Sequence, residues 1–82
     1  MNPRKMKRKL RVRFDLIEAD PEMSDYRKGG EYRALLWLKA YSERRASAEP
    51  LELLAASIRA SSTFGDRNYN AAFMETILRY AQ

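Results

Sequence analysis

Three stretches of the chain repeat apolar residues at spacings of three and four, which is the period of one face of an α-helix. The clearest stretch covers residues 68–81, and residues 31–45 and 47–60 show the same pattern. Hydrophobic residues make up 45% of the 82-residue chain, which is too many for an intrinsically disordered protein. The sequence therefore predicts one small, mainly α-helical domain.

Local start and stop signals divide this domain into segments. Asp20 and Pro21 suit the N-cap and the first position of a helix, and Gly29-Gly30 is a stop signal, so a short helix is expected over residues 21–28. Ser47 and Asp66 are expected to cap the last two helices. The prediction is three to four short amphipathic helices.

Residues 10–17 carry a pattern that favours a strand. Polar residues alternate there with the apolar residues Leu10, Val12, Phe14 and Leu16. The stretch also fits a helix, in which Leu10, Phe14 and Ile17 share one face. The expectation is one short β-strand over about residues 10–17, which must pair with a symmetry mate or another segment to satisfy its backbone.

Positive charge is concentrated at the beginning of the chain. Seven of the 16 Lys and Arg residues, and none of the 11 Asp and Glu residues, stand in the first thirteen positions. The sequence predicts a flexible basic arm over residues 1–9 ahead of a single small helical domain over residues 10–82. The candidate nucleic-acid-binding residues are Arg4, Lys5, Lys7, Arg8, Lys9, Arg11 and Arg13.

Clustered cations bind polyanions because they release the counterions that phosphates condense. The expected partner is therefore a nucleic acid, either DNA or RNA, and the expected function is that of a small regulatory or accessory protein. Two alternatives remain for the basic segment. It is either a solvated tail, or it binds an acidic protein surface or lipid headgroups.

Two resemblances to DNA-binding families follow from the order of elements. A strand carrying Arg11 and Arg13, paired with a two-fold mate, would fit the major groove, and residues 10–60 resemble the ribbon-helix-helix repressors in this coarse order. The chain departs from that family because Pro21 and Gly29-Gly30 lie between the strand and the long helix. Residues 54–61 resemble the start of a helix-turn-helix, with Arg59 in place of the turn glycine.

A chain of this size buries only roughly 60–65% of its unfolded surface and would be marginally stable as a monomer, so a homodimer is expected. Most aromatic side chains are expected in the core, and Trp37, Phe73 and Met74 are the candidate residues for a protein interface. The alternative function is a phage- or plasmid-type inhibitor that blocks a larger host complex, for example an RNA-guided nuclease (anti-CRISPR-like). This alternative is an analogy of size rather than a motif.

The composition argues against an enzyme. The chain contains no Cys and no His, so the common thiolate nucleophile and imidazole proton shuttle are both missing. The acids between residues 15 and 25 match no metal-binding loop, and neither a metal nor a cofactor is expected. No apolar run is long enough to cross a membrane or to serve as a signal peptide, so we expect no membrane partner and a cytoplasmic location.

Overall fold

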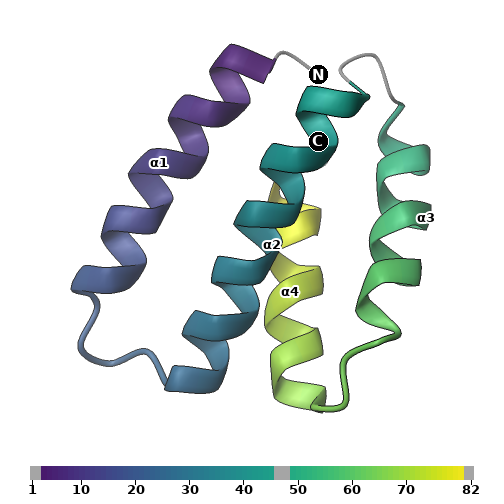
Figure 1. Cartoon of the computed structure of the whole chain (residues 1–82). Helices are drawn as coiled ribbons and strands as arrows, with labels where there is room; N and C mark the ends of the chain where they lie inside the picture. Colours follow the sequence, from purple (N-terminus) through teal and green to yellow (C-terminus); the bar gives the residue numbers. More distant parts are fainter. Residues whose placement is uncertain (1–2, 46–48, 81–82) are drawn as a thin grey trace.

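The computed structural model describes residues 3–45 and 49–80 and contains four helices within them (Figure 1). These are α1 (Pro3–Ala19), α2 (Asp25–Arg44), α3 (Pro50–Ser61) and α4 (Arg67–Tyr80). The described residues form no strand. The prediction of a small, mainly α-helical domain is confirmed. The radius of gyration, 12.2 Å, is close to the roughly 12 Å expected of a single domain of this length.

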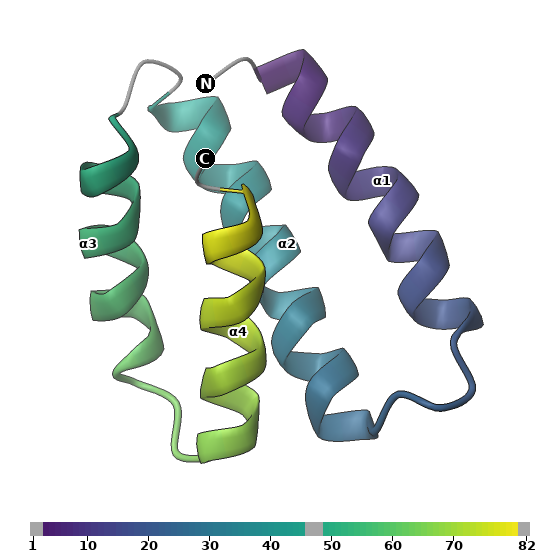
Figure 2. The same ribbon diagram turned by 180° about the vertical axis from the view of Figure 1, so that it is seen from behind.

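Helix α2 is the centre of the bundle. It packs against α1 on one side and α4 on another, while α3 packs against α4. In Figure 1 α2 lies in front of α4, in Figure 2 α4 lies in front of α2, and both views show α1 and α3 at opposite flanks. The core draws on all four helices, and its most deeply buried large apolar side chains are Leu10, Ile17, Leu35, Leu38, Leu53, Phe73 and Ile77.

The strand expected over residues 10–17 is wrong, because these residues belong to α1. Leu10 and Ile17 are 1% and 2% exposed, whereas Val12 and Leu16, which the alternation placed on the buried face, are 62% and 55% exposed. A helix satisfies its own backbone hydrogen bonds, whereas a lone strand needs a partner. Because residues 10–17 form no strand, they cannot pair into a two-stranded ribbon. The resemblance to ribbon-helix-helix repressors therefore has no counterpart in the fold.

Residues 3–9, expected as part of a flexible arm, form the first turns of α1. Met6 lies one turn before Leu10 and is 7% exposed, so the apolar face of the helix extends into the basic stretch. This contact was hidden in the sequence by the charges on either side of Met6. Residues 1 and 2 of the expected arm lie outside the described residues.

The stop signal at Gly29-Gly30 is also wrong, because α2 runs through both glycines. The helix begins at Asp25, where the Ser24 hydroxyl accepts a hydrogen bond from the Arg27 backbone N–H, while Asp20 closes a turn by accepting from the Glu22 N–H. Gly30 is the closest point of contact with α4. A Cβ atom there would lie 2.5 Å from the Tyr69 carbonyl oxygen, so the residue serves helix packing.

The last two helices agree with the sequence prediction. Asp66 caps α4, since its Oδ1 accepts a 2.9 Å hydrogen bond from the Tyr69 backbone N–H. The expected cap Ser47 lies outside the described residues. Helix α3 continues through Arg59 to Ser61, so position 59 is helical and the resemblance of residues 54–61 to a helix-turn-helix turn is not confirmed.

Candidate nucleic-acid interface

Helix α1 carries most of its cations on the side that faces away from α2. Met6, Leu10 and Ile17 point into the core, and the basic side chains between and around them are exposed. With 3.6 residues per turn, positions 4, 8 and 11 fall along one line of the helix surface. The exposed cations lie around the part of the helix circumference that the core leaves uncovered. We call this whole exposed part the cationic face of α1, and it consists of Arg4, Lys5, Lys7, Arg8, Lys9 and Arg11.

This placement of charge opposes helix formation. The first turn of α1 contains no acid, although the positive end of the helix dipole favours acids. Like charges four positions apart, as at Lys7 and Arg11, each destabilise a helix by about 0.2–0.5 kcal/mol. A bound polyanion would reverse both effects. The stability of the fold therefore does not account for the cationic face of α1.

Four of the six cations of this face have no acid partner among the described residues. The ion-paired acids of the described residues are Glu31, Glu52 and Glu75, and their partners are Arg13, Arg27, Arg45 and Arg79. Within the described part of the chain, Lys7, Arg8, Lys9 and Arg11 form no ion pair. These four side chains are available to an external anion.

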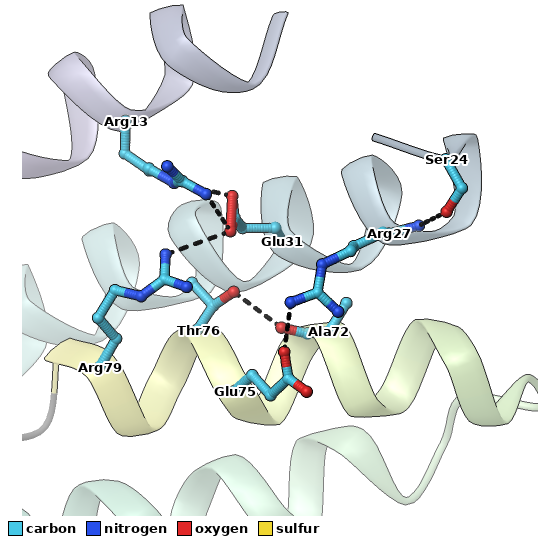
Figure 3. A network of polar contacts seen from close by, with 8 residues as sticks. All are labelled: Arg13, Ser24, Arg27, Glu31, Ala72, Glu75, Thr76 and Arg79. Carbon is cyan, nitrogen blue, oxygen red and sulfur yellow. Dashed lines mark hydrogen bonds and ion pairs between the residues drawn. The ribbon is translucent and has the colours of Figure 1, made fainter. Parts of the chain in front are cut away.

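Arg13 has a different role from the other six predicted cations. Its Nε and Nη2 donate hydrogen bonds to the two carboxylate oxygens of Glu31, at 3.0 and 2.8 Å. Arg79 of α4 donates to the same carboxylate at 3.4 Å, and Figure 3 shows both guanidinium groups pointing at it. The Glu31 side chain is only 3% exposed. Arg13 therefore ties α1 to α2, and its assignment to the nucleic-acid-binding set stays a prediction.

The electrostatics around this carboxylate are consistent with a structural role. The hydrogen bond with Glu31 raises the pKa of Arg13, so its guanidinium stays charged. Burial raises the pKa of the nearby Tyr80 phenol, and the positive charges of Arg13 and Arg79 oppose that rise. The cluster joins α1, α2 and α4 through one buried anion.

A hollow of about 380 Å³ opens between α1 and α2 beside the cationic face. Its walls carry three cations, and its apolar part is supplied by two side chains of α1; the lining residues are Lys7, Leu10, Arg11, Phe14 and Lys39. No acid is found among the described residues that line it. The hollow therefore combines positive charge with an apolar floor, and we call it the α1–α2 hollow.

A second hollow, of about 420 Å³, lies along α2 towards the beginning of α4. We call it the α2–α4 hollow, and its lining residues are Lys28, Gly29, Tyr32, Arg33, Leu36 and Tyr69, again without an acid among those described. The rings of Phe14 and Tyr32 meet edge to face, with centroids 4.7 Å apart. Because Phe14 lines one hollow and Tyr32 the other, the two hollows adjoin.

The α2 side of this surface was missed in the sequence. Lys28, Tyr32, Leu36 and Lys39 recur at spacings of four and three, so helical periodicity alone would have placed them on one face of α2. The expected stop at Gly29-Gly30 separated Lys28 from the other three. Reading the two glycines as a packing site would have revealed the stripe.

The candidate protein-interface residues are less exposed than expected. Phe73 is completely buried, and Trp37 is half-buried, stacked on Tyr41 with a centroid distance of 4.9 Å. Met74 is also half-buried and packs against the core. The choice of Phe73 is wrong, because its ring fills the space between α2 and α4. The expected homodimer stays a prediction, which sedimentation velocity can test.

The described residues contain neither a membrane-spanning helix nor a cluster of metal ligands. None of the four helices is both long and apolar enough to cross a membrane. The acids of residues 15–25 do not gather, and no group of three or more potential metal ligands occurs in the described ranges.

No protein family, curated protein or solved structure matches the chain. The features of the molecule that bear on function are the cationic face of α1 and the two hollows beside it.

Proposed function

We propose that the protein is a small, non-enzymatic nucleic-acid-binding protein that acts as a regulatory or accessory factor. The cationic face of α1 contacts the phosphates of the ligand. The observation that supports this is the concentration of exposed cations in the first turns of α1, where they disfavour the helix itself and where Lys7, Arg8, Lys9 and Arg11 form no ion pair within the described residues.

The cations are held on a helix rather than on a disordered arm, which affects affinity. Met6 and Leu10 fasten the basic part of α1 to the bundle, so the ligand meets charges whose backbone is already ordered. Binding then requires little loss of backbone entropy, in contrast to a segment that folds on its ligand. Cations on an ordered helix should therefore bind the ligand with higher affinity than the same cations on the flexible arm expected from the sequence.

The double variant Arg8→Gln/Arg11→Gln tests this proposal. Both side chains are exposed and outside the ion pairs of the described residues, so the fold is expected to persist while affinity for a random oligonucleotide falls. Two lost phosphate contacts should reduce the slope of log K against log salt by about 1.4 to 1.8. Fluorescence anisotropy with labelled oligonucleotides at several salt concentrations measures both quantities.

The matched control is Arg59→Gln/Arg67→Gln, which removes the same net charge from exposed positions of α3 and α4. The control should bind almost as well as the original protein. Equal weakening in the two variants would mean that only net charge matters, and it would contradict a site on α1. If no nucleic acid binds and a protein partner is captured in stoichiometric amounts, the inhibitor alternative is favoured instead.

A further inference from the structure

We infer that the ligand is single-stranded nucleic acid, whose phosphates lie on the cations of α1 and α2 and whose bases enter the two hollows along α2. This inference rests on the proposed function and names the class of nucleic acid that the site takes. Three features of the described surface support it: the charge of the α1–α2 hollow, the rings that line both hollows, and the concave shape of the site.

The α1–α2 hollow has the charge of a phosphate site. Lys7 and Arg11 stand one turn apart on α1, and Lys39 faces them from α2. The described residues that line the hollow include no acid to compete for these three cations. The positive charge is thus supplied from two helices, which converts the cationic face of α1 into a cleft that continues onto α2.

Aromatic rings are interleaved with these cations, as in proteins that bind single strands. Phe14 forms part of the α1–α2 hollow, and Tyr32 and Tyr69 form part of the α2–α4 hollow. Tyr32 is 41% exposed, although its ring packs edge to face with that of Phe14, a contact that restrains it. A ring that is both exposed and held in place offers a base a stacking surface without first having to be ordered.

The α2–α4 hollow supplies further charge beyond these rings. Lys28 and Arg33 line it, and the Arg33 guanidinium lies 5.6 Å from the centroid of the Phe64 ring. Cations therefore stand on both sides of Tyr32, in an order that matches a strand whose phosphates alternate with bases. A backbone that crosses from one hollow to the other meets cations in both.

Shape distinguishes a single strand from a duplex. In a duplex the bases are stacked on one another and shielded by the backbone, so recessed rings cannot reach their faces. Phe14 and Tyr69 are half-buried within the hollows rather than protruding from the surface. A flexible strand can insert its bases there, whereas a duplex can contact only the outer cations of α1.

The test compares an oligothymidylate of about 12 nucleotides with a duplex of the same length, using the full chain and fluorescence anisotropy. The single strand should bind at least about tenfold more tightly at equal salt. Tyr32→Leu, which keeps an apolar side chain against Phe14, should weaken single-strand binding by about tenfold and leave duplex binding unchanged. Tyr32→Trp should retain single-strand binding.

Tyr26→Leu is the matched control, because Tyr26 is also an exposed tyrosine of α2, 61% exposed, but lines neither hollow. It should bind as the original protein does. A second measurement uses the unchanged protein. Irradiation of its complex with a 5-bromouracil-substituted strand should crosslink the strand to Phe14, Tyr32 or Tyr69. Mass spectrometry identifies the crosslinked residue.

The outcomes separate this inference from the proposed function. Duplex binding as tight as single-strand binding, lost in Arg8→Gln/Arg11→Gln, would overturn the single-strand inference and leave the proposed function standing. Equal effects of Tyr32→Leu and Tyr26→Leu, or crosslinks confined to other residues, would also overturn the inference. Failure to bind either oligonucleotide would overturn both.

Discussion

Gly30→Ala is expected to destabilise the protein by about 2 kcal/mol and to lower Tm by roughly 10 °C. The added Cβ atom would lie 2.5 Å from the Tyr69 carbonyl oxygen and 2.8 Å from the Ala72 Cβ. Both atoms belong to the rigid framework of α4, so α2 and α4 must move apart. Overpacking of this kind costs about 3 kcal/mol, and the higher helix propensity of alanine offsets about 1 kcal/mol of that loss.

Gly29→Ala is the control for this variant, because it makes the same change one position earlier in the same helix. A Cβ atom there would lie 3.3 Å from Tyr69 Cε2, an atom of a side chain that can shift. The gain in helix propensity should compensate, leaving stability within about 0.5 kcal/mol of the original. Thermal unfolding followed by circular dichroism measures both variants, and similar Tm values for the two would rule out a special contact at Gly30.

Glu31→Gln is expected to cost about 2–3 kcal/mol of unfolding free energy, measured by urea denaturation. The carboxylate is 3% exposed and accepts hydrogen bonds from Arg13 and Arg79, and the amide cannot hold both cations. Because Arg13 is partly exposed, its guanidinium can turn to water, which keeps the loss below that of a fully buried pair. Helix α1 should loosen most, since this carboxylate is its main polar link to α2.

Two comparisons sharpen the result for Glu31. Glu75→Gln breaks the exposed ion pair with Arg27 and should cost no more than about 1 kcal/mol. Arg13→Gln combined with Glu31→Gln should lose less than the sum of the single variants, by at least about 1 kcal/mol, because the two groups are coupled. Additive losses would show that Arg13 and Glu31 do not act as a pair.

The periodicity of the sequence was sufficient to predict the helices that bury a wide apolar face. Leu35, Leu38 and Tyr41 were expected on one face of a helix, and all three are buried. Residues 10–17 were assigned wrongly because over one short stretch a period of two and a helical period both fit Leu10 and Phe14. The choice between them depended on Met6 and on the packing surface of α2, which are tertiary information.

The sequence was sufficient to name the cations of the candidate site, but it did not predict how the fold arranges them. Six of the seven cations named from the sequence lie on the exposed face of α1. Arg11 is one of them, whereas Arg13, two positions later, forms an ion pair with Glu31. A strand would have placed them side by side, whereas a helix rotates them about 200° apart. The partner of Arg13 lies 18 positions along the chain, a pairing that no local pattern reveals.

Helix α1 packs against α2 and, among the described helices, against no other. Opening of α1 alone would expose part of the core and take Arg13 away from Glu31, while the contacts of α2 with α4 and of α3 with α4 would remain. A nucleic acid bound along α1 would disfavour this opening, so raising its concentration should slow the amide exchange of residues 3–19 more than that of α4.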